Sequence, residues 1–377
     1  MHLDLIRGVS ALAVMLGHVR GLFFVDYSVL GGHPSLFLRM LYALTGFGHQ
    51  AVIVFFVLSG YFIGNSVLEQ IRGHRWSWRV YLVNRLTRLE LVLLPALLLG
   101  TLWDQLGMRL PQAAAFYYGG LYKYYPPSVA LRSTVPVFLS NLFFLQSIVA
   151  PVLGSNGPLW SLSYEFWYYL LFPILLLAIF SWTGIRSRVL YLGLTFLLFW
   201  FIGGTISVYF LIWLLGVVIG QVWRIQPGRS AWVWAAITLI AAAPLIAALG
   251  WVRMHPNASE MRGDVLIGIC FALWTYFILQ SRRTDAAPAY SKTSRALAAF
   301  SYTLYLTHFP LLLLVRGWLD PEGNWQPDAM HLAYGTVLAF AVLAFAYILA
   351  RFTEARTGQV RRRVMYWLTP PIKEAVQ

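Results

Sequence analysis

Charged residues and cysteine are both scarce in this sequence of 377 residues. Only 11% of the residues are charged, against about 25% in soluble domains, and 59% are hydrophobic. This balance excludes an ordinary soluble domain. The sequence therefore predicts an all-α integral membrane protein, a polytopic bundle of helices. The single cysteine, Cys270, excludes an intramolecular disulfide and a cysteine-rich metal site, and we expect no metal.

Long apolar runs recur along the chain, each long enough for a hydrocarbon core of about 30 Å. The sequence predicts about ten transmembrane spans, with the approximate bounds 4–25, 47–68, 84–103, 159–181, 188–204, 206–223, 231–250, 264–281, 296–318 and 331–352. The segment Val135–Leu153 is apolar but contains Asn141 and Gln146. We expect it to be a re-entrant or interfacial segment on the outer side, packed against protein.

Basic residues outnumber acidic ones, and the formal net charge is +14. With a cytoplasmic N-terminus, twenty of the 28 Lys and Arg residues fall on the cytoplasmic side, as the positive-inside rule requires. Membrane orientation therefore explains the charge, and we expect no nucleic-acid partner. Both termini are predicted to be cytoplasmic. We expect one transmembrane domain over residues 1–355 and a basic tail over 356–377, whose arginines contact membrane lipids.

The first predicted span carries three ionisable residues, Asp4, Arg7 and His18. The eleven-residue step from Arg7 to His18 is about three helical turns, so both side chains share one face with Asp4. Ionisable groups inside a membrane are costly and usually face a cavity or a partner. Anchoring at the headgroups would explain Asp4 and Arg7, but not the deeper His18. This face is a candidate site.

Glu165 and His308 are predicted to lie at a depth similar to that of His18. The three residues could converge in one polar cavity, where a carboxylate would raise the basicity that a general base needs. A structural hydrogen-bond network between helices is the alternative. Two histidines and one glutamate could also ligate zinc, but no local ligand spacing supports it.

Five short motifs follow one another along nearly the whole chain. They are Leu3-Asp4 with Arg7-Gly8, Ala11 and His18; Gln50–Gly60; Arg85 with Arg88; Trp160-Ser161-Leu162-Ser163 with Glu165; and Ser301-Tyr302 with Tyr305 and His308. In this order they resemble the acyltransferase 3 family, ten-helix membrane enzymes that move acyl groups onto sugars and related acceptors. Leu91 departs from the pattern, because such sequences often have proline after the arginine pair.

The resemblance implies an acyl-CoA donor, commonly acetyl-CoA, that enters from the cytoplasm. It also implies that His18 is the essential catalytic residue and that Arg7 helps to hold the donor. We expect His18 to act as general base on an acceptor hydroxyl while Glu165 orients it or steadies its positive charge. A two-step route through an acyl-histidine is the alternative. The other predicted site residues are His308 beside the catalytic pair; Asp4, Arg85 and Arg88 on the donor side; and Trp160, Ser161, Ser163, Tyr302 and Tyr305 on the acceptor side.

The expected acceptor is a glycan or a lipid-linked sugar, and the expected location is the bacterial inner membrane. One alternative is a transporter or flippase for a lipid-linked sugar, because ten helices with a polar interior suit that class too. Another is an acyltransferase for a non-glycan acceptor such as a macrolide-type metabolite. Tyrosines in the outer 104–158 connection, on which sugar rings could stack, favour carbohydrate. A homodimer is left open.

Overall fold

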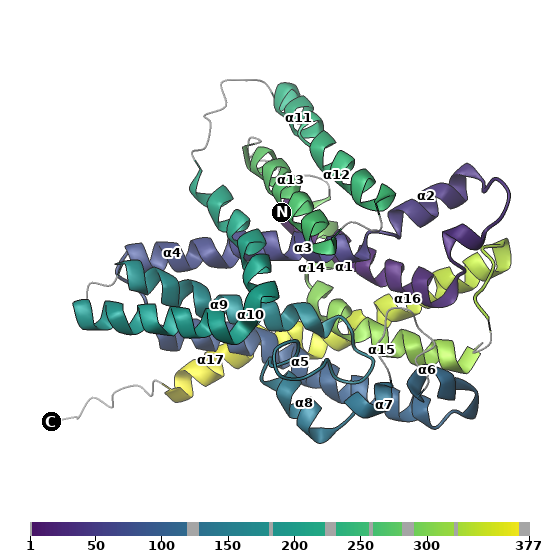
Figure 1. The fold of residues 1–377 in the computed structure, drawn as a ribbon, viewed down its shortest axis with the longest axis horizontal. Coiled ribbons are helices and arrows are strands. Elements are labelled where there is room, and N and C mark those ends of the chain that lie inside the picture. Colours follow the sequence, from purple (N-terminus) through teal and green to yellow (C-terminus); the bar gives the residue numbers. More distant parts are fainter. Residues whose placement is uncertain are drawn as a thin grey trace. The chain divides into compact units, whose positions relative to one another are not determined.

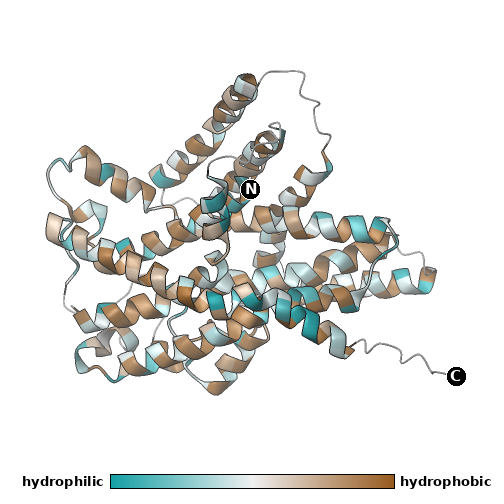
Figure 2. Cartoon of the chain, turned by 180° about the vertical axis from the view of Figure 1, so that it is seen from behind, coloured by the Kyte–Doolittle hydropathy of each residue, from teal (hydrophilic) through white to brown (hydrophobic). Residues whose placement is uncertain are grey.

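A computed structural model describes residues 2–118, 128–180, 184–222, 231–255, 259–280, 290–319 and 323–368. These residues form helices and connections, with no named strand among them. The all-α prediction is confirmed. The chain divides into two compact units, each described here by itself. Figure 2 shows long hydrophobic helices whose hydrophilic residues gather at helix ends and near the C-terminus.

The first unit comprises residues 1–74, 160–298 and 324–332. Its main elements (Figure 1) are α1 (His2–Phe23), α2 (Leu36–Leu44), α3 (Gly48–Ser59), the π-helical turn η2 (Gly60–Gly64), α4 (Asn65–Arg72), α9 (Leu159–Phe180), α10 (Ile185–Gln221), α11 (Ala231–Ile240), α12 (Ala243–Met254), α13 (Glu260–Gln280) and α14 (Ser291–Ala298). Within this unit α3 packs against α1, α10 and α13. The candidate site described below lies around α3.

The second unit comprises residues 75–159, 299–323 and 333–377. Its main elements are α5 (Trp78–Met108), α6 (Ala114–Tyr118), α7 (Val129–Arg132), α8 (Val135–Leu142), α15 (Ser301–Leu319), α17 (Thr357–Leu368) and most of α16 (Ala329–Phe352). Helices α5 and α15 pack against each other along an extensive contact. Asp104 on α5 is buried and accepts hydrogen bonds from the backbone and the hydroxyl of Ser155, at 2.8 and 2.6 Å.

The number of spanning helices differs from the predicted ten. Eight helices among the described residues are long and apolar enough to cross a membrane, and nine if the bent pair α14–α15 counts as one span. The predicted spans 188–204 and 206–223 form the single long helix α10. Ten spans are reached only if α10 crosses twice.

Helix α10 is too long for one simple crossing. Its 37 residues correspond to about 55 Å at 1.5 Å per residue, against a hydrocarbon core of about 30 Å. Gly203 interrupts the helix with φ 76° and ψ 175°, a left-handed backbone that favours glycine because other residues clash there. The direction of α10 changes along its length in Figure 1. The structure therefore places the break at Gly203, one residue before the end of the predicted span 188–204.

Glycine pairs bring α3, η2 and α10 into close contact. Gly60 and Gly64 are four residues apart, as are Gly216 and Gly220. A Cβ atom at Gly60 would lie 1.8 Å from the carbonyl oxygen of Trp213, and one at Gly216 would lie 1.9 Å from the carbonyl oxygen of Val57. Small residues at this spacing allow membrane helices to approach backbone to backbone. This contact holds α3 against α10.

The segment Val135–Leu153 contains only one eight-residue helix, α8, which is too short to cross the membrane. Its polar residues brace the fold: Asn141 hydrogen-bonds the backbone of Leu153 and Pro151, and Gln146 donates to the carbonyl oxygen of Leu159. The prediction that this segment is not a span is confirmed. Its position at the outer interface stays a prediction.

The start of the predicted tail is folded. Helix α17 carries Arg361, Arg362 and Arg363 and packs on α5 within the second unit. Residues 369–377 of the tail lie outside the described residues. The predicted boundary at residue 356 falls in the short 3-10 turn η4 (Glu354–Arg356) that precedes α17.

Candidate functional site

Arg7 joins two helices of the first unit. Its Nη2 lies 3.3 Å from the carbonyl oxygen of Ala298, the last residue of α14, and 3.5 Å from Oδ1 of Asp4. The last carbonyls of a helix have no partner within it, so a guanidinium there stabilises the helix end. The side chain of Arg7 is still 26% exposed. Arg7 therefore has a structural contact in addition to its predicted role with the donor.

His18 lies at the crossing of α1 and α3. It is half-buried and follows Gly17, where a Cβ atom would lie only 3.6 Å from Cα of Gly48. His49 comes next after Gly48 in the chain. Because successive Cα atoms are about 3.8 Å apart, the Cα atoms of His18 and His49 are no more than about 13 Å apart. Two histidines therefore lie on neighbouring helices near this crossing.

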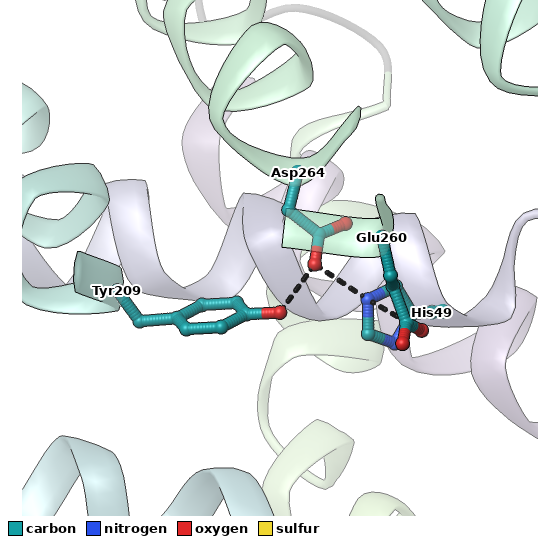
Figure 3. Close-up of polar contacts among 4 residues, drawn as sticks. All are labelled: His49, Tyr209, Glu260 and Asp264. Atoms are coloured by element: carbon teal, nitrogen blue, oxygen red, sulfur yellow. Dashed lines mark hydrogen bonds and ion pairs between the residues drawn. The ribbon is translucent and has the colours of Figure 1, made fainter. Parts of the chain in front are cut away.

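His49 belongs to a cluster of polar side chains from three helices, drawn in Figure 3. Its Nε2 lies 2.8 Å from Oδ2 of Asp264 on α13 and 3.5 Å from Oε1 of Glu260 one turn earlier. Tyr209 on α10 donates its hydroxyl hydrogen to the same oxygen of Asp264. A carboxylate is only an acceptor, so Nε2 of His49 carries a hydrogen and donates it to Asp264.

The burial of Asp264 explains why two donors converge on it. Only 2% of its side chain is exposed, and an isolated buried carboxylate would lose its hydration without compensation. The hydrogen bonds from His49 and Tyr209 replace that hydration, and they tie α13 to α3 and α10. His49 itself is 30% exposed, so the pair joins a buried anion to an accessible imidazole.

Aromatic rings surround this pair on the side of α9. The ring of Trp160 lies nearly parallel to that of His49, with centroids 5.9 Å apart and an interplanar angle of 16°. Trp160 also makes edge contacts with Phe56, Tyr164 and Tyr209. Such edge-to-face packing fixes ring positions. Trp160, predicted on the acceptor side, is thus in contact with a polar cluster that includes none of the other predicted site residues.

His49 and Asp264 have sequence features that indicate a functional site, although neither is among the predicted site residues. Asp264 stands at the start of a predicted span, and ionisable residues inside spans mark functional sites. His49 lies in the predicted span 47–68, directly before Gln50–Gly60, the segment that resembles the family motif. The two residues are 215 positions apart, and no local spacing connects them.

Glu165 lies on α9 in the first unit and is half-buried. Tyr169 donates its hydroxyl hydrogen to Oε1 of Glu165. The same hydroxyl lies 3.2 Å from Oγ of Ser59, and this Oγ accepts a hydrogen bond from Nε1 of Trp213 at 3.2 Å. Glu165 is therefore held by a network joining α3, α9 and α10. Its action on His18 stays a prediction.

The other predicted residues of α9 and α5 have varied surroundings. Ser161 and Ser163 are buried, with 6% and 0% exposed. In the second unit, the guanidinium of Arg85 lies 5.8 Å from the ring centroid of Tyr81, whereas Arg88 is exposed. The donor and acceptor roles of these four residues stay predictions.

Helix α15 of the second unit carries the last group of predicted residues. His308 is fully buried, and its Nδ1 lies 2.9 Å from the carbonyl oxygen of Leu304, to which it donates. The hydroxyls of Tyr305 and Tyr302 donate to the carbonyl oxygens of Pro158 and Leu89, at 3.1 and 3.5 Å. The convergence of His308 with His18 and Glu165 of the first unit stays a prediction.

Comparison with known proteins bears on the whole chain. A sequence model of the acyltransferase 3 family, described as an acyltransferase domain, matches residues 2–351. No curated protein and no solved structure matches the chain. The match covers the candidate site and both units up to residue 351, and the long apolar helices make the protein an integral membrane protein. The chain therefore belongs to the acyltransferase 3 family and is a membrane acyltransferase.

Proposed function

We propose that the protein transfers an acyl group, specifically an acetyl group, from acyl-CoA to a hydroxyl of a carbohydrate. The acceptor would be a glycan or a lipid-linked sugar, and the location the bacterial inner membrane. The observation that carries the proposal is the position of His18, a half-buried imidazole on a helix that can span the membrane, in a chain of this family.

In the proposed reaction His18 takes the proton of the acceptor hydroxyl. The acceptor oxygen bonds to the carbonyl carbon of the thioester, the carbon–sulfur bond breaks, and the thiolate of CoA takes up a proton. A positioned general base of this kind contributes about 10² to 10⁴ in rate. Glu165 would steady the positive charge that develops on His18, because a nearby carboxylate favours the imidazolium form.

The donor is proposed to enter from the cytoplasm. Arginine binds phosphate through several N–H groups, and Arg7 lies eleven residues before His18 on α1. Asp4 would orient Arg7, and Arg85 and Arg88 would add positive charge for the CoA phosphates. His308 with Trp160, Ser161, Ser163, Tyr302 and Tyr305 would shape the acceptor side.

A variant of His18 tests the proposal. Purified His18→Ala protein in lipid nanodiscs should lose transfer of the labelled acetyl group from acetyl-CoA, by about 10² or more, while expression and thermal unfolding stay as in the wild type. Mass spectrometry of surface glycans from cells with and without the protein identifies the acceptor. Transfer at the wild-type rate by the variant would contradict the role of His18.

The same assay separates the two chemical routes and the rival function. An acetylated His18 found by mass spectrometry after a burst of CoA release would establish the two-step route. A flippase for a lipid-linked sugar would need no acyl-CoA, so acetyl-CoA should raise the thermal stability only if the protein is an acyl-CoA enzyme.

A further inference from the structure

Helix α17 follows a helix that is long enough to complete a membrane crossing. The 24 residues of α16 correspond to about 36 Å at 1.5 Å per residue, against a hydrocarbon core of about 30 Å. The turn η4 and the 12 residues of α17 come after this crossing. Helix α17 packs on α5 within the second unit. A helix in this position lies at the membrane surface, at the level of the lipid headgroups.

Two sides of α17 differ in burial and in chemistry. Thr357, Val360 and Val364 are three and four residues apart and are half-buried, as expected for the side of a helix that packs on a neighbour. The exposed side, here named the α17 face, consists of Arg362, Arg363, Tyr366 and Trp367. The hydrophilic residues of this helix are visible next to the C-terminal end in Figure 2.

The α17 face combines cationic and aromatic side chains in adjacent pairs. Arg362 and Tyr366 are four residues apart, as are Arg363 and Trp367, so each guanidinium lies next to a ring on the helix surface. The two rings are 63% and 74% exposed. Tyrosine and tryptophan concentrate at the level of the lipid headgroups, and the planar guanidinium matches the geometry of phosphate. This composition fits the headgroup region of a bilayer.

The packing of α17 on α5 brings two basic segments of the second unit together. Residues 79–90 and 353–368 contain seven arginines and two glutamates. Each arginine near a membrane surface adds to the attraction for acidic lipids, and this attraction acts over about one Debye length. The excess of positive charge therefore favours acidic over neutral phospholipids.

Glu354, in the turn before α17, caps another helix of the same unit. Its Oε2 accepts hydrogen bonds from the backbone N–H of Thr303 at 3.2 Å and from the hydroxyl of Thr303 at 3.1 Å. The first N–H groups of a helix have no partner within it and favour a negative charge, and Thr303 is in the first turn of α15. The carbonyl oxygen of Glu354 accepts from the hydroxyl of Thr357, where α17 begins. One glutamate therefore joins the start of α17 to the start of α15.

We propose that the α17 face binds the headgroups of acidic phospholipids, and that this binding holds Glu354 against the start of α15. In a neutral membrane α17 is held less firmly, and the hydrogen bonds to Thr303 open more often. The occupant is lipid rather than CoA, because the face lies opposite the side that packs on α5 and pairs arginine with exposed rings. Since α15 carries His308, an acidic membrane orders a helix with predicted site residues.

A dye on α17 reports lipid binding without any acyl donor. In a Cys270→Ser background, Gln359→Cys provides one cysteine at an exposed position one turn before the arginines, to which an environment-sensitive dye is attached. Phosphatidylglycerol added to the full-length protein in detergent micelles should change the fluorescence to saturation, whereas phosphatidylcholine with the same chains should not. In Arg362→Gln/Arg363→Gln, half-saturation should need about tenfold more phosphatidylglycerol, since two charged contacts are lost.

Arg186→Gln/Lys292→Gln is the matched control. Both residues are exposed and basic and belong to segments predicted to be cytoplasmic, but they lie in the first unit. This double variant should respond to phosphatidylglycerol as the wild type does. Equal responses of the wild type to the two lipids, or an equal loss in the control, would overturn the inference. Displacement of phosphatidylglycerol by CoA would assign the α17 face to the donor and reject lipid as its occupant.

Hydrogen exchange of α15 tests the link through Glu354. In nanodiscs the amide of Thr303 should exchange about fivefold more slowly with phosphatidylglycerol than with phosphatidylcholine, the factor expected for one hydrogen bond. Arg362→Gln/Arg363→Gln should give one rate in both lipids. Glu354→Ala should also give one rate, while the dye on α17 still responds to phosphatidylglycerol. Glu354→Gln, which keeps an oxygen acceptor, should retain part of the difference.

The outcomes separate this inference from the proposed function. One exchange rate for Thr303 in both lipids in the wild type would overturn the link to α15. Neither measurement depends on acyl transfer. A wild-type protein that binds phosphatidylglycerol at α17 but transfers nothing from acetyl-CoA would support the lipid site and reject the proposed donor.

Discussion

At the scale of single residues, Arg7 combines a helix contact with a predicted ligand contact. Its Nη2 reaches the last carbonyl of α14 and the carboxylate of Asp4. Arginine has five N–H donors, so a structural contact does not exclude a second one to phosphate. The two roles predict different measurable effects.

Arg7→Ala should therefore lower the melting temperature of the protein without donor and raise KM for acetyl-CoA about tenfold or more, as for the loss of a charge-assisted hydrogen bond. Differential scanning fluorimetry with and without acetyl-CoA measures both. If the melting temperature falls while the shift produced by acetyl-CoA stays as in the wild type, Arg7 serves only the helix end.

Glu165 also combines an observed structural contact with a predicted catalytic role, and a variant of Tyr169 separates the two. Glu165→Gln removes the negative charge, whereas Tyr169→Phe removes only the hydrogen bond to it. If Glu165 steadies charge on His18, the first variant should lower kcat about tenfold or more and the second much less, with KM for acetyl-CoA little changed. Equal small effects of both variants in steady-state kinetics would assign Glu165 to the hydrogen-bond network alone.

At the scale of secondary-structure elements, the contact of α3 and η2 with α10 determines where His49, Tyr209 and Glu165 lie. Glycines allow the two backbones to touch. The aromatic cluster around Phe56 packs beside this contact, with rings from α9 and α10. The arrangement of the polar cluster therefore depends on residues that have no side chain.

Gly216→Ala tests this dependence. The added Cβ would lie 1.9 Å from the carbonyl oxygen of Val57, so the helices must separate, at a cost of about 1–3 kcal/mol or more. We expect a lower melting temperature and reduced activity. Gly193→Ala on the same helix is the control, because a Cβ there meets no atom within 4 Å. A wild-type melting temperature for Gly216→Ala would show that α10 is not held by this contact.

At the scale of the whole molecule, the number of membrane crossings decides the side of each terminus. Eight or ten crossings place both termini on the same side, whereas nine place them on opposite sides. In the part of the chain that the structure describes, eight helices are long and apolar enough to cross a membrane, or nine with the bent pair, and ten crossings result if α10 crosses twice at Gly203. The distribution of Lys and Arg favours an even number with both termini inside.

Cysteine labelling measures this directly. In a Cys270→Ser background, a cysteine added after Gln377 should react with a membrane-impermeant maleimide only in inverted vesicles. Val29→Cys, at a position 63% exposed in the connection after α1, should react only in right-side-out vesicles. Reaction of both cysteines from one side would contradict the predicted orientation.

The features of the fold that could be predicted depend on local sequence patterns. The helical class follows from the apolar runs, and most spans follow from their length. The break in α10 was expected between residues 204 and 206 and lies at Gly203. The polar residues Asn141 and Gln146 correctly indicated that Val135–Leu153 does not cross the membrane, because buried amides need partners that lipid does not supply.

By itself the sequence determined the membrane class, the helical fold, the family and the position of His18 on α1, because each depends on composition, on the helical period or on short motifs. Only the tertiary structure decided that His49 pairs with Asp264, that Tyr209 shares this carboxylate, and that Arg7 reaches the end of α14. These partners are up to 291 residues apart. A buried charge is satisfied by whichever donor the packing brings near, and packing is a property of the folded chain rather than of any local spacing.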